Sequence, residues 1–448
     1  MDTERFVSKR LLRRGDRAGI LAVASLLCFN GFPVGATAHV MQAADERQLL
    51  PNTPIEAELR SGEVHVYKIT LEAGAYLRLL ITPRDIILQS QLSAPGGAED
   101  IGVSFIPTEK GTRFVSLVAE SPGSYRLEIR LAEDVAKTGR YEVKIEELRP
   151  ATERDKMRVA AEKGEAEGLT LLNRISTSEQ GRRGIAKYEE ALLLWRKLDE
   201  SKSVMRVLNS LVIQLRKIGE PQTALEYARQ AIEIARTLGD RYQEANLTIA
   251  IGIHHRSLGE NQKALDSFHQ SRQLFRSLSA GYGEAIAVYH IGTTLKSIGE
   301  QQEALRHCED ALALFSATGD RKSEVQALNS LGQIHRILGD KQKAIDFHNR
   351  ALEISRTRKY LDLEAYSLGN LGNAYFDLGD KPKALDLYEQ AVKLSRVIGN
   401  PLGEADGLKM IGEVALSVGD HQKALGCFDQ SLLLVRSILE RNREALVL

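Results

Sequence analysis

Cysteine is scarce in this chain, with three residues among 448. A fold held together by many disulfides is therefore excluded. Several motifs that mark catalytic or cofactor sites are missing as well: a Gly-rich phosphate loop, H-E-x-x-H, Cys-x-x-Cys and the G-x-S-x-G elbow. We therefore expect a protein that is not an enzyme and that holds no cofactor and no metal.

An excess of charge of either sign is also lacking, because Lys+Arg and Asp+Glu both number 60. A general nucleic-acid binder would show a basic excess. We therefore expect no nucleic-acid partner.

The N-terminal segment differs from the rest of the chain. Six basic residues between Arg5 and Arg17 precede an apolar stretch, residues 18–32, and then Ala36-Thr37-Ala38. This order of basic, apolar and small residues is typical of a secretory signal peptide. We predict a signal peptide over residues 1–38 and a protein exported across the inner membrane, periplasmic or secreted. The alternative is an uncleaved anchor, and only then do we expect membrane contact.

Residues 45–149 show the period of two that is typical of strands. Alternating stretches cover residues 64–71, 76–81, 113–118, 125–131 and 141–145, and turn signals such as Pro95-Gly96-Gly97 separate them. We predict seven or eight short strands in an antiparallel β-sandwich. The turn Leu71-Glu72-Ala73-Gly74 and the pairs Gly123/Tyr125 and Gly139/Tyr141 resemble the bacterial pre-peptidase C-terminal type of sandwich.

A 40-residue period dominates the remaining chain. The period is marked by a glycine and, five residues later, by an alanine in each of six units. The glycines are Gly219, Gly259, Gly299, Gly339, Gly379 and Gly419. The alanines are Ala224, Ala264, Ala304, Ala344, Ala384 and Ala424. Such a period predicts a solenoid of helical pairs. We expect each glycine to end a helix in the left-handed conformation, and each alanine to lie where two helices cross.

The repeat resembles the tetratricopeptide repeat. The match is clearest at Leu371-Gly372, Tyr375, Ala384, Tyr388 and Ala391, which follow the apolar, small and aromatic order of that family. The common form has 34 residues, and the longer form here is similar to the repeats of kinesin light chains and of Leu-Gly-Asn-type polarity adaptors. The resemblance implies a solenoid over residues 152–440 with about seven helical hairpins. The predicted fold class is thus α+β multidomain: an antiparallel β-sandwich followed by an all-α tetratricopeptide solenoid.

Residues 441–448 repeat the register of an earlier repeat start, because Glu444-Ala445 corresponds to Glu404-Ala405. We predict that they begin a truncated further repeat. The order of signal, sandwich and 40-residue repeats resembles bacterial proteins in which the repeats lead into a caspase-like CHAT peptidase domain. That resemblance implies an alternative function, the regulatory or sensor half of a truncated or split peptidase.

Histidine and cysteine also fall within the repeats. His254 and His255 are adjacent on a helix and so point about 100° apart, which disfavours a shared metal ion. His348 occupies the slot that Tyr388 fills one repeat later, so we expect it to pack in the core. Cys308 and Cys427 lie on helices three repeats apart, and we predict two free, buried thiols.

The resemblance implies that the first helix of each pair lines a concave groove. The side chains predicted to line it are Arg206, Asn209, Arg216, Asn246, Arg256, Tyr289, Lys296, Gln326, Asn329, Gln333, Arg336, Tyr366, Asn373 and Phe376. A ladder of cations runs through this set, at Arg216, Arg256, Lys296 and Arg336. Cations in register attract acidic segments. We therefore expect a non-enzymatic scaffold or adaptor that binds a peptide or protein through an acidic segment.

Overall fold

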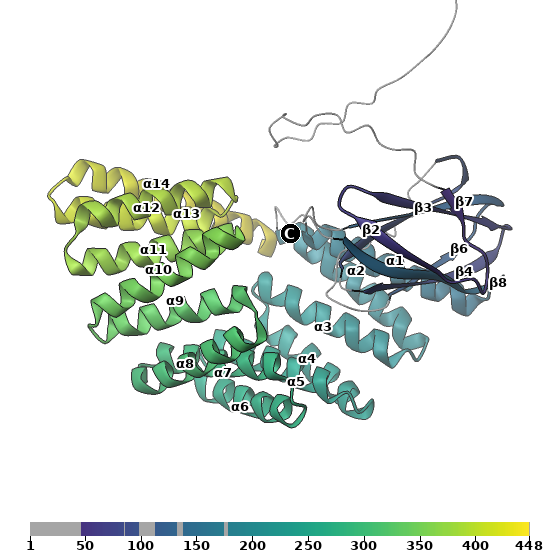
Figure 1. The fold of residues 1–448 in the computed structure, drawn as a ribbon, viewed down its shortest axis with the longest axis horizontal. Coiled ribbons are helices and arrows are strands. Elements are labelled where there is room, and N and C mark those ends of the chain that lie inside the picture. Colours follow the sequence, from purple (N-terminus) through teal and green to yellow (C-terminus); the bar gives the residue numbers. More distant parts are fainter. Residues whose placement is uncertain (1–45, 85, 98–112, 132–137, 174–177, 448) are drawn as a thin grey trace, which may run out of the picture. The chain divides into compact units, whose positions relative to one another are not determined.

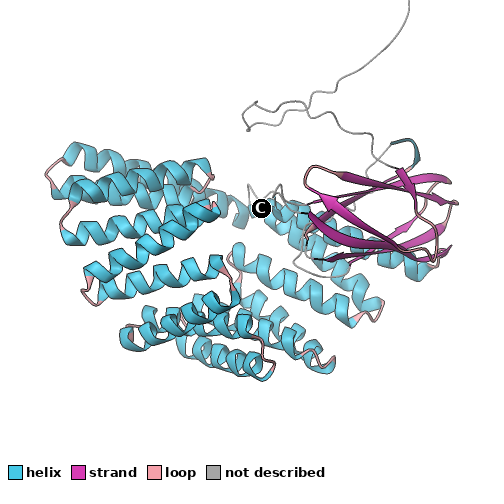
Figure 2. Cartoon of the chain, viewed as in Figure 1, coloured by secondary structure: helices cyan, strands magenta, loops and turns pink. Residues whose placement is uncertain are grey.

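The computed structural model describes residues 46–84, 86–97, 113–131, 138–173 and 178–447. Strands occupy the N-terminal part of this range and helices the rest (Figures 1 and 2). The predicted signal segment, residues 1–38, lies outside the described residues. Across the described ranges, no helix is long and apolar enough to span a membrane.

Eight strands in the described part form two four-stranded sheets, ordered β1-β3-β7-β5 and β2-β8-β4-β6. They are β1 (Glu46–Gln48), β2 (Ile55–Arg60), β3 (Val64–Leu71), β4 (Ala75–Arg84), β5 (Leu88–Ser93), β6 (Arg113–Val118), β7 (Gly123–Leu131) and β8 (Thr138–Pro150). The strand alternation places one side of each sheet in a shared core, where Tyr67, Leu79 and Leu127 are fully buried. The predicted sandwich is confirmed. The named strands pair antiparallel except at one edge, where the three-residue strand β1 pairs with β3 in parallel.

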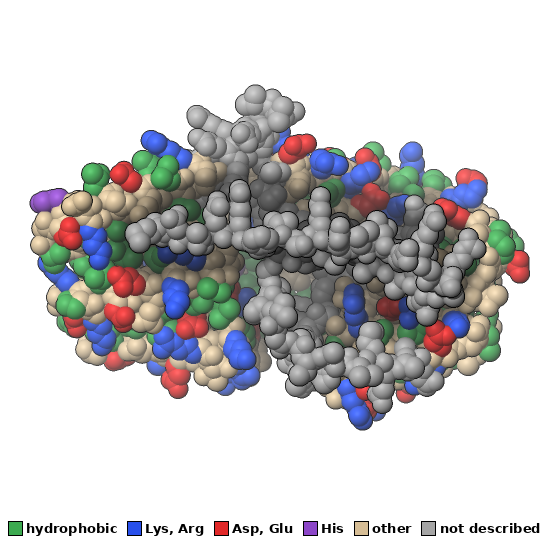
Figure 3. Space-filling model, turned by 90° about the horizontal axis from the view of Figure 1, so that it is seen from above, with side chains coloured by type: hydrophobic (Ala, Val, Ile, Leu, Met, Phe, Trp, Pro, Cys, Tyr) green, Lys and Arg blue, Asp and Glu red, His purple; other side chains and the backbone are tan. Residues whose placement is uncertain are grey.

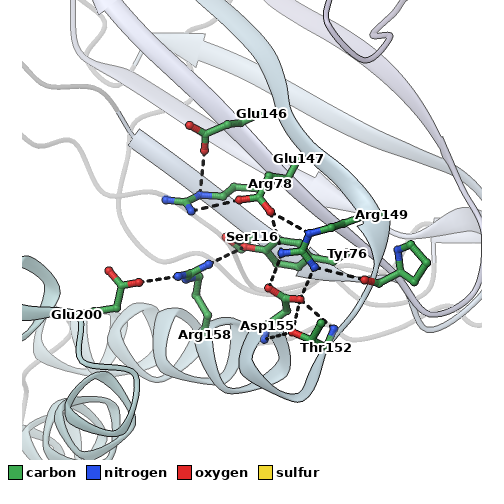
Figure 4. A network of polar contacts seen from close by, with 11 residues as sticks. Tyr76, Arg78, Ser116, Glu146, Glu147, Arg149, Thr152, Asp155, Arg158 and Glu200 are labelled. Atoms are coloured by element: carbon green, nitrogen blue, oxygen red, sulfur yellow. Dashed lines mark hydrogen bonds and ion pairs between the residues drawn. The ribbon is translucent and has the colours of Figure 1, made fainter.

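The sandwich ends in a capping box that starts the first helix, α1 (Glu153–Asn173). Asp155 accepts a bond from the backbone N–H of Thr152 at 2.9 Å, and its own N–H donates to Thr152 Oγ1. Arg149 on β8 forms an ion pair with the same carboxylate at 2.6 Å (Figure 4). This hydrogen bond to Arg149 holds the pKa of Asp155 well below its usual range.

Helix α1 also covers an exposed strand edge. Strand β6 is at the end of its sheet, so its outward N–H groups have no strand partner there. Glu162 on α1 accepts from the backbone N–H of Ser116 on β6 at 3.0 Å and from its hydroxyl at 3.1 Å. Burial raises the pKa of Glu162 to about 7. On the same helix, Arg158 bonds to Glu200 at 2.6 Å (Figure 4).

Fourteen helices follow in the described part of the chain, packed as seven hairpins. After α1 they are α2 (Ser178–Lys197), α3 (Ser201–Lys217), α4 (Pro221–Thr237), α5 (Arg241–Ser257), α6 (Asn261–Ser277), α7 (Gly281–Ser297), α8 (Gln301–Thr318), α9 (Arg321–Ile337), α10 (Lys341–Arg358), α11 (Leu361–Leu378), α12 (Lys381–Val397), α13 (Pro401–Ser417) and α14 (His421–Val447). Residues 441–447, predicted to begin a further repeat, continue α14 without a turn.

The described turns on both sides of α3 to α13 each contain a left-handed residue. The six glycines that mark the 40-residue period lie at φ between 77° and 94°, as predicted. The other turns, offset from these glycines by 20 residues, use Asp199, Gly239, Ser279, Gly319, Lys359 and Gly399, at φ between 53° and 74°. These turn residues were not predicted from the sequence, because only three of the six are glycine.

In five of the seven helical pairs, α5–α6 to α13–α14, the two helices touch at a second set of glycines. A Cβ added at any of these would lie 2.5 to 2.7 Å from the facing side chain. The pairs are Gly252–Phe268, Gly292–Cys308, Gly332–His348, Gly372–Tyr388 and Gly412–Phe428. The core packing predicted for His348 is therefore confirmed. The six period alanines are also buried, as expected.

Both described cysteines are free thiols. Cys308 is buried against Gly292, and burial raises the pKa of its thiol to about 12. The prediction that both thiols are buried is wrong for Cys427, which is only half-buried.

We predict opposite effects for two alanine substitutions in α11. Gly372→Ala would push Tyr388 aside, so we expect the free energy of unfolding to fall by about 1–2 kcal/mol. At Gly369 an added Cβ would have no atom within 4 Å. Gly369→Ala should therefore raise the free energy of unfolding by about 0.5–1 kcal/mol, because alanine has the higher helix propensity. Urea unfolding followed by circular dichroism measures both. Equal effects of the two variants would contradict the close-contact explanation.

We predict that His348 makes the array sensitive to acid. Burial lowers the pKa of His348 to about 3, with a smaller contribution from nearby Arg336. Between pH 6.5 and 3, the unfolded chain therefore binds a proton that the folded chain does not, and stability falls by about 1.4 kcal/mol per pH unit. His348→Tyr should reduce the loss of stability between pH 7.5 and 4.5 by about 2–3 kcal/mol.

The reverse change is the matched control. Tyr388→His places a histidine in the same slot one repeat later, and it should make the loss of stability on acidification larger. Unfolding free energies at both pH values test the pair of variants. Identical pH dependence in His348→Tyr and the native chain would overturn this role of His348.

Candidate ligand-binding groove

The odd-numbered helices form the inner side of the array. Each of them from α3 to α11 contacts the next odd-numbered helix directly, past the even-numbered helix between them in the chain. Side chains near the C-terminal end of each odd-numbered helix therefore stand beside those of the next repeat. Arg216, Arg256, Lys296, Arg336 and Phe376 all lie in this last turn of their helices.

Two of the predicted cations are neutralised within the chain. Arg336 forms an ion pair with Asp377 on α11 at 2.8 Å. Arg206 forms a bidentate pair with Glu165 on α1, and its guanidinium lies 6.0 Å from the Trp195 ring. The structure therefore does not support a uniform positive ladder, because each of these side chains already has a carboxylate.

Arg256 and Lys296 have polar but uncharged partners. Arg256 Nη1 donates to Thr293 Oγ1 at 2.8 Å, and Lys296 Nζ donates to Gln333 Oε1 at 2.5 Å. Both contacts span 37 residues and cross from one odd-numbered helix to the next. Neither cation forms an ion pair with a carboxylate of the described residues.

Arg216 differs because of the residue opposite it. The position 37 residues after Arg216 is Ile253, which offers no acceptor. Arg216 is exposed, whereas Arg256 and Lys296 are half-buried. Three cations on successive odd-numbered helices thus face the groove without a described carboxylate partner.

Burial makes the positive charge of the inner pair costly. It lowers the pKa of the Arg256 guanidinium, and Arg216 lowers that pKa further. It also lowers the pKa of the Lys296 ammonium, to which Arg256 contributes. A desolvated charge without a counter-charge costs free energy. An anion placed between these side chains would recover part of that cost.

A cavity of about 510 Å³ opens at this pair. Its lining includes Arg256, Asn261, Tyr289, Thr293, Lys296 and Ser297. These supply hydroxyl and amide groups beside the two cations. Asn261, Thr293 and Ser297 were not predicted from the sequence. The cross-helix partners lie 37 residues apart in the chain, so comparing residues at the 40-residue period does not bring them together.

Several other predicted groove residues hold the repeats together. Gln333 Nε2 donates to Tyr366 Oη at 2.7 Å and to Asn370 Oδ1 at 3.0 Å, which links α9 to α11. Asn329 is fully buried and bonds to His348 and Ser367, so its amide does not face the groove as predicted.

The remaining predicted residues line the same helices. Asn373 Oδ1 accepts from Tyr388 Oη at 2.8 Å, so this acceptor atom is already used. Asn209, Asn246 and Gln326 are half-buried on α3, α5 and α9, and Phe376 is half-buried against the core of the last repeats.

On the face seen in Figure 3, positive, negative and hydrophobic side chains are intermixed. The chain as a whole has no net formal charge, so the two cations at the cavity are not part of an overall basic excess.

The tetratricopeptide repeat family models match residues 203–277, 283–357 and 365–396. No curated protein sequence gives a significant match to the chain.

Solved structures share the helical fold. Aspartyl phosphate phosphatase F from Bacillus subtilis is 16% identical with a TM-score of 0.53, over 63% of this chain and 71% of that one. A Rap protein complexed with Competence and Sporulation Factor is 18% identical with a TM-score of 0.50, over 63% and 77%. The Rap conjugation gene regulator of plasmid pLS20, in complex with the Phr* peptide, is 14% identical with a TM-score of 0.50, over 65% and 78%. The chain therefore carries tetratricopeptide repeats within residues 203–396, and the solved structures share its helical fold.

Proposed function

We propose that the chain is a non-enzymatic scaffold whose groove binds an acidic segment of a peptide or protein. The observation that carries this proposal is the pair Arg256 and Lys296, half-buried in one cavity without a described carboxylate partner. Elsewhere in the same groove the chain neutralises its cations itself, at Arg336 and Arg206. A bound carboxylate would do the same here.

The surroundings of the pair suit a peptide. The Asn261 amide can bond to a peptide backbone, and the Tyr289 ring adds apolar contact. The Thr293 and Ser297 hydroxyls already donate to carbonyls of their own helix, so they can only accept from a peptide N–H. Two proteins of similar fold were solved with bound partners, Competence and Sporulation Factor and the Phr* peptide. Both partners are ligands of the other two proteins. For this chain they support only the proposal that the fold binds peptides or proteins.

The test is a binding assay with random nonapeptide pools of acidic, neutral and basic composition, followed by fluorescence anisotropy. We expect the acidic pool to bind the full chain, and more weakly as salt rises. Arg256→Gln with Lys296→Gln should weaken that binding at least about tenfold, because buried charge partners are costly to lose.

The matched control removes the same charge from the other helices. Arg229 on α4 and Lys393 on α12 are exposed, and Arg229→Gln with Lys393→Gln should leave binding unchanged. Equal binding of the acidic pool to both double variants would refute the groove proposal.

We also propose that residues 1–38 direct export, on the strength of their basic, apolar and small pattern. After expression in a bacterial host, the chain should be recovered from the periplasm with His39 as its first residue. Intact mass and N-terminal sequencing measure this. A chain that starts at Met1 in the membrane fraction would indicate the uncleaved anchor instead, and one left in the cytoplasm would refute export.

A second proposed function is regulation of a caspase-like CHAT peptidase. It is supported by the order of a pre-peptidase-like sandwich and 40-residue repeats. In that case the groove would bind the peptide that controls a peptidase.

A further inference from the structure

We infer that the cavity at Arg256 and Lys296 takes a dianionic phosphoryl group, carried on a side chain of the bound peptide. This inference rests on the proposed function, because it names the chemistry of the ligand at the same site. It is argued from charge, from the donors that line the cavity and from the volume available.

Charge balance distinguishes this site from the other cations of the groove. Arg336 has one carboxylate, Asp377, and Arg206 has one, Glu165. The chain thus neutralises one cation with one carboxylate at both places. Arg256 and Lys296 place two positive charges on one cavity, and Arg216 on the neighbouring α3 adds to the positive potential at Arg256. A single carboxylate would leave one of the cavity's two charges unbalanced.

A phosphoryl group brings more charge to one point. Phosphoserine carries about −1.5 to −2 near pH 7, on three acceptor oxygens. Two adjacent carboxylates could match that charge, but two separate side chains must then be ordered, at a greater entropic cost. One dianionic group therefore suits this cluster better than one or two carboxylates.

The donors in the cavity fit those three oxygens. Arg256 can offer two N–H groups and Lys296 its ammonium, and both form charge-assisted bonds with phosphate. The Asn261 amide lines the same cavity and can donate as well. The Thr293 and Ser297 hydroxyls already donate to the helix carbonyls of His290 at 3.2 Å and Thr294 at 2.6 Å, so they do not serve as donors to the phosphate. A volume of about 510 Å³ holds the group together with the part of the peptide that carries it.

Burial shifts the pKa of four titratable groups near the cavity. It lowers the pKa of His290 to about 3, with a smaller contribution from Arg256, and it lowers the pKa of His254. Burial raises the pKa of Tyr289 and of Cys308. Any titration of the protein acts on every peptide pool alike, so a change in affinity between pH 5.5 and 7.5 that only the phosphoserine pool shows reports on the ligand.

The experiment compares nonapeptide pools with random flanks and one fixed central residue: phosphoserine, glutamate, a Glu-Glu pair or serine. Anisotropy is measured with the full chain and with the Arg256→Gln/Lys296→Gln variant. We expect phosphoserine to bind about tenfold more tightly than glutamate, and we expect the variant to lose this preference. Phosphopeptide binding should weaken from pH 7.5 to 5.5, because the second phosphate pKa is about 6, whereas glutamate binding should not.

Each other outcome overturns a stated part. Equal binding of the glutamate or Glu-Glu pool refutes the phosphoryl inference and leaves the acidic-peptide function standing. Failure of every acidic pool to bind refutes both. Inorganic phosphate, measured as a competitor, separates the sources: if it binds as tightly as the phosphopeptide, the ligand is free phosphate and the peptide part is wrong.

Discussion

The last five helical pairs, α5–α6 to α13–α14, depend on one close contact. A glycine in the first helix lets a side chain of the second lie where a Cβ would stand, as Gly372 does for Tyr388. The five pairs place Phe, Cys, His, Tyr and Phe opposite that glycine. In α3–α4 the corresponding residues are Val212 and Ala228, both buried, so there the larger side chain stands on the first helix and the same space is filled from the other side.

This contact fixes the register of everything on the inner side. Once the helices of each pair are locked, the last turns of α5, α7 and α9 fall beside one another. Arg256 and Lys296 then reach the next helix and share one cavity. The array thus holds like charges together at a cost in stability that its buried core offsets. Such unbalanced charge is a feature of binding sites, since a ligand can supply the missing charge.

Hydrogen bonds that satisfy backbone N–H groups join the sandwich to the first helix. The free edge of β6 donates to Glu162, and the start of α1 is satisfied by Thr152 and Asp155. Buried donors at a strand edge and at a helix start both need acceptors. Here Glu162 on α1 supplies the acceptor for β6, and α1 also packs against α2 as the first hairpin of the helical array.

The sequence by itself determined the period, the helical pairs, the left-handed glycines and the buried alanines, because these depend on residues close in the chain or repeated without change. It also predicted Arg256 and Lys296 as groove residues. Only the tertiary structure decided which cations stay unbalanced. Arg336 meets Asp377 and Arg206 meets Glu165 through contacts between repeats, about forty residues apart in the chain. Those contacts depend on the distance between side chains on packed helices, and the sequence pattern does not give that distance.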